Sequence, residues 1–177
     1  MKTLLLVMAI VAVAAQAAFA AAGNAQTPSA ACKAERNAMG AADFKSLYAP
    51  TGPAASALGK CVSKHQRSNA ANRANSAKAC KAEMAMPEAD FRAAHDGKSF
   101  GETYGRNEND KNAYGKCVSK KADTASAQQE TAVMKASKAC KAERGTTTES
   151  RTAFTAKYGG KASNAFGKCV SSKNKTK

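Results

Sequence analysis

A cysteine-bearing block recurs three times along the chain and sets the strongest constraint on its fold. Each copy opens with A-C-K-A-E and closes with A-[LYF]-G-K-C-V-S, and an F-x-x-x-Y pair lies between the two motifs. Recurrence of blocks this specific predicts one structural unit used three times. Each unit contributes one pair of cysteines, and the six residues are Cys32, Cys61, Cys80, Cys117, Cys140 and Cys169.

The segments between the units predict long helices. Residues 61–80 and 117–140 contain neither Gly nor Pro and are rich in Ala, Lys, Gln and Arg. The ends of a helix over 61–80 would lie about 28 Å apart, whereas the Cα atoms of a disulfide lie about 5.5 Å apart. Bridges across the connectors are thereby excluded, and bridges within each unit are the simplest pairing.

Alanine is the expected packing residue of both connector helices. In the first helix the best apolar face is Ala70, Ala74 and Ala77. The second helix shows a period between three and four, which predicts a narrow stripe suited to close packing. That stripe comprises Val118, Ala122, Ala125, Gln129, Ala132, Ala136 and Cys140.

Large apolar side chains are too few to hold such a chain together by themselves. Only 11 of the 157 residues after residue 20 are Leu, Ile, Val or Phe, well below the roughly 20% under which a charged chain is expected to stay unfolded. Each bridge within a unit would close a loop of about thirty residues and contribute about 3–4 kcal/mol. Covalent links are therefore expected to replace part of the missing core.

Recurring residues inside each unit suggest how the bridge is packed. The Phe and Tyr of the F-x-x-x-Y pair share a helical face and are expected to cover the sulfurs. The glycine two residues before the closing cysteine is expected to let the opening helix approach closely; these are Gly59, Gly115 and Gly167. The glutamate of the opening motif is expected to meet the lysine of the closing motif. The three expected pairs are Glu35 with Lys60, Glu83 with Lys116, and Glu143 with Lys168.

The first twenty residues have the pattern of a secretory signal peptide. A short basic start precedes an apolar stretch, and the small residues Ala18 and Ala20 predict cleavage near Ala20. The apolar stretch, about a dozen residues, is shorter than the roughly 20 residues of a membrane-spanning helix. We therefore expect a secreted or extracytoplasmic protein of the periplasm or cell envelope, a setting in which thiols oxidise to disulfides.

Together these features predict an all-α fold, an extended array of three small disulfide-stapled helical modules joined by long Ala/Lys-rich helices. The expected segments in chain order are a signal peptide (1–20), a flexible leader (21–30), repeat unit 1 (31–64), a helical connector (65–78), repeat unit 2 with an insertion (79–120), a second helical connector (121–138), repeat unit 3 (139–172) and a basic tail (173–177).

Titratable groups do not form a recognisable catalytic or metal-binding pattern. His65 lies among basic residues of an expected exposed helix and His95 lies in the inserted loop, so both are predicted to be surface histidines. Residues 107–110 lack the glycine and terminal glutamate of a calcium loop, which favours a solvated loop. No C-x-x-C motif occurs. We therefore expect no catalytic residue, no cofactor and no bound metal.

Basic charge is the remaining functional signal. The chain has 28 Lys and Arg against 13 Asp and Glu, a net charge of +15. Such a field attracts anionic polymers, although it also serves solubility alone. No aromatic residue is interleaved with the cations, so stacking on nucleic-acid bases is not indicated. The cations expected to form an anion-binding surface are Lys64, Arg67, Arg73, Lys78, Lys173 and Lys175.

The two motifs and the F-x-x-x-Y-G segment between them resemble secreted bacterial proteins of uncharacterised function that carry one or several such units. The similarity covers nearly all of residues 31–172 and implies no activity. This chain departs from the pattern in the insertion of its second unit and in Ala49, which stands where the pattern has Gly. We expect a secreted, non-enzymatic binding or structural repeat protein of the cell surface that uses its basic surface against anionic polymers. The alternative is a secreted effector, either a protease inhibitor or an antimicrobial protein.

Overall fold

A computed structural model describes residues 26–159 and 161–175, and these form eight helices and no strand. The all-α prediction is therefore confirmed for the described residues, whereas the signal peptide expected over 1–20 lies outside them. The helices are α1 (Pro28–Met39), α2 (Ala41–Tyr48), α3 (Ser56–Met84), α4 (Glu88–Ala94), α5 (Phe100–Tyr104), α6 (Ala113–Arg144), α7 (Thr148–Lys157) and α8 (Ala162–Lys175).

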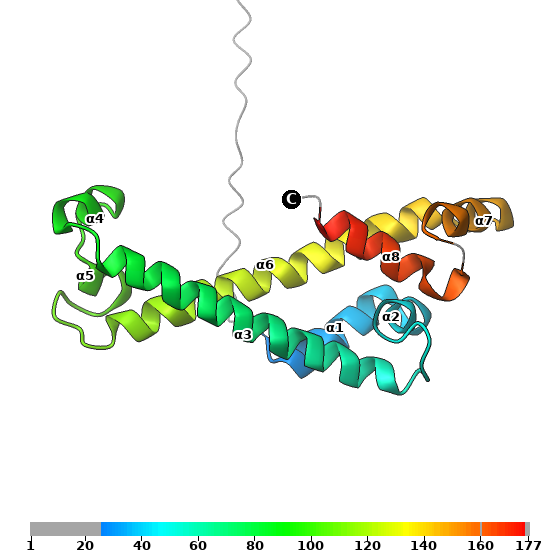
Figure 1. Ribbon diagram of the computed structural model, residues 1–177, viewed down its shortest axis with the longest axis horizontal. Coiled ribbons are helices and arrows are strands. Elements are labelled where there is room, and N and C mark those ends of the chain that lie inside the picture. Colours follow the sequence, from blue (N-terminus) through cyan, green and yellow to red (C-terminus); the bar gives the residue numbers. More distant parts are fainter. Residues whose placement is uncertain (1–25, 160, 176–177) are drawn as a thin grey trace, which may run out of the picture.

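Two long helices form the frame of the molecule. α3 and α6 contain the helices predicted over 61–80 and 117–140, and they run in opposite directions while crossing each other (Figure 1). Helices α4 and α5 join them at one end, and α1, α2, α7 and α8 gather at the other. The long helices therefore make a hairpin that brings the first and last units to the same end.

Three disulfides tie the short helices to this frame. They join Cys32 to Cys61, Cys80 to Cys117 and Cys140 to Cys169, with Cα separations of 6.0, 6.1 and 6.1 Å. All six cysteines are fully buried. The pairing within units is thus the one expected from the sequence.

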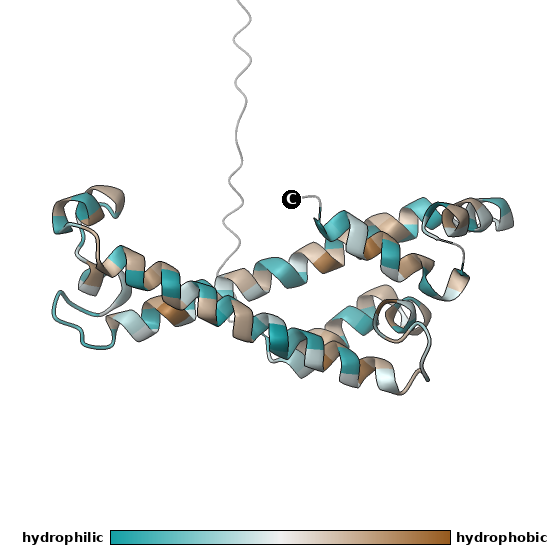
Figure 2. Cartoon of the chain, in the orientation of Figure 1, coloured by the Kyte–Doolittle hydropathy of each residue, from teal (hydrophilic) through white to brown (hydrophobic). Residues whose placement is uncertain are grey.

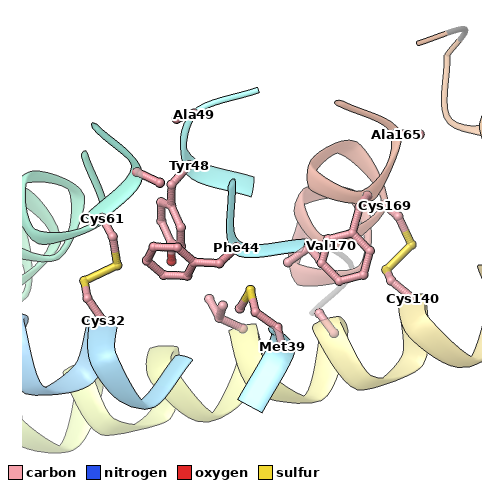
Figure 3. Close-up of a cluster of buried hydrophobic side chains, with 14 of the residues drawn as sticks. Cys32, Met39, Phe44, Tyr48, Ala49, Cys61, Cys140, Ala165, Cys169 and Val170 are labelled. Atoms are coloured by element: carbon pink, nitrogen blue, oxygen red, sulfur yellow. A yellow bond between two sulfur atoms is a disulfide. The ribbon is translucent and has the colours of Figure 1, made fainter. Parts of the chain in front are cut away.

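Units 1 and 3 share one hydrophobic core. Met39 and Phe44 from unit 1 pack in the same cluster as Phe154, Phe166 and Val170 from unit 3. Figure 3 shows this cluster between the Cys32–Cys61 and Cys140–Cys169 disulfides. The expectation of an extended array is wrong in this respect, because the hairpin places units 1 and 3 side by side and burial of their apolar side chains in one cluster removes both from water.

Unit 2 lies at the other end of the hairpin and has a smaller core. Cys80, Cys117 and Val118 are buried there, with Phe100 and Tyr104 partly buried against them. Hydrophilic and hydrophobic residues alternate along both long helices (Figure 2). Within the described part of the chain, no helix is both long and apolar enough to cross a bilayer.

The contact face of α3 is polar rather than alanine-lined. Ala70 and Ala74 are exposed, so the predicted face is wrong at these two residues, whereas Ala77 is partly buried against the core of unit 2. Instead the amide of Asn72 donates to the hydroxyl of Ser126 on α6 at 3.1 Å, and Ser76 is buried. Small polar residues that satisfy one another across the helix pair can replace alanine at such a contact.

The predicted stripe of α6 is partly confirmed. Four of its residues are buried, namely Val118, Ala122, Ala136 and Cys140. In the middle of the helix the buried residues are Ser126 and Val133, one position after the predicted Ala125 and Ala132. The amide of Gln129 donates to the hydroxyl of Ser68 on α3 at 3.1 Å, so this contact is also polar.

The recurring glycines do not all serve close approach. A Cβ atom at Gly59 or Gly115 would meet no atom within 4 Å, so the expectation fails for those two. At Gly167 a Cβ atom would lie 2.6 Å from the carbonyl oxygen of Ser46. The close approach at Gly167 is therefore to α2 of unit 1 rather than to the opening helix of its own unit.

The ends of the described chain are more ordered than expected. The last three residues of the expected leader belong to α1, which begins at Pro28 and is capped by the hydroxyl of Thr27 accepting from the Ala30 N–H at 3.3 Å. At the other end α8 continues to Lys175. Pro at the first helical position and a Thr cap are typical helix-start residues.

Candidate functional site

The same polar contact recurs beside each disulfide. In unit 1, Glu35 follows Cys32 by three residues on α1, and His65 follows Cys61 by four residues on α3. These spacings place each polar residue on the same helical face as its cysteine. Tyr48 donates its hydroxyl to Glu35 Oε2 at 2.5 Å, and His65 Nε2 lies 2.9 Å from Glu35 Oε1. Unit 1 therefore holds a glutamate between a tyrosine and a histidine.

Unit 2 has the same arrangement with lysine in place of histidine. Tyr104 donates its hydroxyl to Glu83 Oε2 at 2.8 Å, and Lys121 Nζ donates to Glu83 Oε1 at 2.8 Å. Partial burial opposes ionisation of Glu83, but the hydrogen bonds from Lys121 and Tyr104 outweigh it and lower the pKa of this carboxyl. Glu83 is thus held as a carboxylate.

Unit 3 surrounds its glutamate with two lysines. Tyr158 and Lys157 donate to Glu143 Oε1 at 2.9 and 2.5 Å, and Lys173 Nζ lies 2.9 Å from Oε2. The hydrogen bonds from Lys157 and Lys173 lower the pKa of Glu143 to about 2. Lys173, expected in the anion-binding surface and the tail, instead belongs to this contact.

The partner of each glutamate differs from the one predicted. Lys116 pairs with Asp110 at 2.6 Å and Lys168 donates to the Gly159 carbonyl at 3.3 Å, while Lys60 lines a surface groove. A residue one position before a cysteine does not share its helical face, whereas a residue four positions after it does. The sequence already contained an indication of the true partner, because the residue four positions after the closing cysteine is basic in every unit. These residues are His65, Lys121 and Lys173.

The contact in unit 1 is the most deeply buried of the three. Glu35 is 1% exposed and His65 is 7% exposed, whereas the side chains of Glu83 and Glu143 are 22% and 25% exposed. The prediction of His65 as a surface residue is wrong because it faces α1 and its partner Glu35, which lies 30 residues earlier in the chain. A buried charged group requires such a partner.

A second carboxyl lies close to this buried pair. Oε1 of Glu130, on α6, is buried and has no hydrogen-bond partner among the described residues. Burial raises the pKa of Glu130, and the charge of Glu35 adds to the rise while that of His65 opposes it. Three helices therefore bring Glu35, His65 and Glu130 into one electrostatic cluster.

Sulfur atoms complete this cluster. One ligand atom from each of Cys32, Cys61 and His65 lies within 4.8 Å of the others, and all three residues are buried. Glu35 Oε2 lies 3.9 Å from Cys61 Sγ. The two sulfurs are joined in a disulfide, so they do not act as thiolate ligands in this state.

The inserted loop of unit 2 is also more organised than predicted. His95 is half-buried and stacks on Phe91, with ring centroids 4.0 Å apart. The Asp110 carboxylate accepts from the backbone N–H groups of Arg106 and Asn112. Lys116 and these backbone bonds lower the pKa of Asp110 to about 2. His95 is therefore a packing residue, and Asp110 closes the loop.

The expected anion-binding residues do not form one continuous surface. Lys64 and Arg67 line an open groove of about 610 Å³ beside Leu47 and Tyr48. Arg73 lies about 180° from Lys64 around α3 and lines a different depression with Tyr114. Lys78 and Lys175 are exposed at other places on α3 and α8.

Lys60 and Ser63 join Lys64 and Arg67 in lining the first groove, which we call the α3 groove. The Lys64 ammonium lies 5.4 Å from the centre of the Tyr48 ring, whose hydroxyl bonds to Glu35. The α3 groove therefore lies directly outside the buried cluster of unit 1.

Comparisons with known proteins identify no relative of this chain. No protein-family model, curated protein or solved structure matches the chain. The disulfides by themselves indicate an oxidising, extracytoplasmic environment.

Proposed function

We propose that the chain is an exported, non-enzymatic repeat protein of the cell surface or extracellular space that binds anionic polymers through the α3 groove. The observation that carries the proposal is the convergence of Lys60, Lys64 and Arg67 on one groove. With about 100° per residue these three cations lie within about 60° of one another around α3.

The charge balance of α3 supports this role. The helix carries six lysines and arginines and one acid, Glu83, which lies near its C-terminal end. Among the described residues, no carboxylate forms an ion pair with Lys60, Lys64 or Arg67. Cations without an internal carboxylate partner are available to an external anion, and their summed field attracts polyanions.

The shape of the groove fits the same class of ligand. Leu47 and Tyr48 also line the groove, and Ser56 and Ser63 add hydroxyl groups to it. Such a lining suits a polymer that carries anionic groups together with hydroxyls or apolar ring faces. Acidic polysaccharides of the cell envelope have this chemistry.

The test compares two triple variants of equal net charge on immobilised heparin and on purified acidic envelope polysaccharide. The first carries Lys60→Gln, Lys64→Gln and Arg67→Gln in the groove. The control carries Lys33→Gln, Lys138→Gln and Lys161→Gln, three exposed positions away from the groove. We expect the groove variant to elute at clearly lower salt than the control. Equal elution of the two variants would contradict a binding site in the groove.

A further inference from the structure

We propose that Cys32, Cys61, His65 and Glu35 form a zinc site once the Cys32–Cys61 disulfide is reduced, so that unit 1 exchanges a covalent bridge for a metal bridge. This site is independent of the proposed polymer binding, because its four side chains are buried beneath the α3 groove rather than lining it.

The geometry brings four donors together from two helices. α1 contributes Cys32 and Glu35, and α3 contributes Cys61 and His65. The donor atoms of the cysteines and the histidine lie within 4.8 Å of one another. Glu35 lies at the edge of this group, with Oε2 3.9 Å from Cys61 Sγ and Oε1 2.9 Å from His65 Nε2. Two thiolates, one imidazole and one carboxylate form a tetrahedral donor set that Zn²⁺ accepts.

The space between the helices suits a metal of this size. Two thiolates on a tetrahedral zinc lie about 3.8 Å apart, because each Zn–S bond is about 2.3 Å. The Cα atoms of Cys32 and Cys61 are 6.0 Å apart, so the sulfurs can separate to this distance by small side-chain rotations. Reduction therefore opens room for the ion without moving either helix far.

The outer contacts of the site fit a metal centre. The hydroxyl of Tyr48 donates to Glu35 Oε2 and orients the carboxylate. The carboxyl of Glu130 lies near His65 and has a buried oxygen without a hydrogen-bond partner among the described residues. Carboxylates and hydroxyls that hold a metal ligand in place commonly increase metal affinity.

The other two units provide controls within the same molecule. Glu83 and Glu143 follow their cysteines by three residues, as Glu35 follows Cys32, but Lys121 and Lys173 occupy the position of His65. A protonated lysine has no lone pair to give to a metal. Among the described residues, only the bridge of unit 1 therefore has an imidazole clustered with its two cysteines, and His95 of unit 2 belongs to no such cluster.

The chemistry requires an external dithiol as reductant. Thiol–disulfide exchange transfers two electrons and two protons to the Cys32–Cys61 bridge, producing two thiols while the reductant is oxidised to its own disulfide. Zn²⁺ then binds as both thiols lose their protons to solvent, which gives two thiolate–metal bonds. Because zinc binds only the reduced form, it shifts the bridge toward reduction.

The experiment measures the reduction of each bridge separately in the full chain. The protein is equilibrated in dithiothreitol redox buffers with and without a fixed concentration of free Zn²⁺, and thiols are trapped by alkylation and located by peptide mass spectrometry. Free Zn²⁺ is set at about 100 times its Kd for the protein with a reduced Cys32–Cys61 pair. The ratio of reduced to oxidised dithiothreitol at which half of the Cys32–Cys61 bridges are reduced is then expected to fall about 100-fold. The ratios for Cys80–Cys117 and Cys140–Cys169 are expected to stay unchanged.

His65→Lys is the matched variant, because it gives unit 1 the residue that units 2 and 3 already carry and keeps a hydrogen-bond donor beside Glu35. We expect this variant to fold with all three bridges and to lose the zinc effect on Cys32–Cys61. Reduced wild-type protein should also bind one Co²⁺ with the visible absorption of a thiolate-bound tetrahedral ion, and the variant should not. The proposal would be overturned if zinc shifted the reduction of all three bridges equally or did not shift that of Cys32–Cys61. It would also be overturned if the His65→Lys variant kept the zinc effect.

Discussion

Arg144, the last residue of α6, binds the carboxylate of Asp43 on α2 through both of its terminal nitrogens, although the two residues lie 101 positions apart. Arg144 Nη2 lies 3.1 Å from Asp43 Oδ2, and the guanidinium also lies over the ring of Phe166, 5.3 Å from its centre. This one side chain therefore connects the end of the hairpin, unit 1 and unit 3.

Removal of the buried glutamate of unit 1 is expected to cost more than removal of its counterpart in unit 2. Glu35→Ala leaves the buried His65 and the Tyr48 hydroxyl without their partner, which should destabilise the fold by about 3–5 kcal/mol. Glu83→Ala removes a more exposed contact and should cost about 1 kcal/mol. Urea unfolding with the disulfides intact measures both values. Equal losses would show that burial does not distinguish the two contacts.

Glu130→Gln is expected to stabilise the protein at neutral pH. The pKa of Glu130 is raised above its ordinary value of 4.5 by burial, so the folded chain holds this proton more tightly than the unfolded chain does. The stability that depends on this proton is complete below about pH 4.5 and declines as pH rises through the raised pKa. The melting temperature of the variant should therefore be higher than that of wild type at about pH 7, and the difference between the two melting temperatures should decrease toward about pH 4. A variant that melts lower at neutral pH would contradict this assignment.

Glu143 is expected to make the stability of unit 3 sensitive to acid. Hydrogen bonds from Lys157 and Lys173 lower the pKa of Glu143 from its ordinary value of 4.5 to about 2. A carboxyl with a lowered pKa contributes stability above its unfolded value, and that contribution is lost as pH falls from about 4.5 through about 2. Melting curves of wild type and Glu143→Gln should therefore differ at about pH 6 and converge near pH 2. A constant difference across this range would contradict the prediction.

Alanine at two of the recurring glycines should have opposite effects. Gly167→Ala places a methyl group 2.6 Å from the Ser46 carbonyl oxygen and should cost about 1–3 kcal/mol. Gly59→Ala meets open space on a helix and should stabilise by up to about 1 kcal/mol. Thermal melting compares the two variants directly. A neutral Gly167→Ala would show that α8 does not pack tightly on α2.

The parts of the fold that follow from local pattern could be predicted from the sequence. The helices over 61–80 and 117–140 lack breakers, and their length excludes bridges across them. Pairing within units was then the simplest prediction, and the Cys32–Cys61 bridge confirms it for unit 1. The shared core could not, because Gly167 and Ser46 meet only after the hairpin has closed. No local period shows which distant faces will come together.

The buried cluster of unit 1 was missed for a related reason. His65 stands among basic residues on α3, and its partner Glu35 lies on a separate helix. The usable signal was comparison between units, since the residue four positions after each closing cysteine is His or Lys. The burial of this position depends on α1 packing across it, which helix periodicity does not show.

The packing of unit 3 against unit 1 is the central claim, and a double-mutant cycle between Asp43 and Arg144 tests it most directly. The free energy of unfolding is measured for wild type, Asp43→Ala, Arg144→Ala and the double variant. A bidentate, partly buried pair predicts a coupling energy of about 1–3 kcal/mol between these residues. Strictly additive losses, within about 0.5 kcal/mol, would contradict the fold-back of unit 3 onto unit 1.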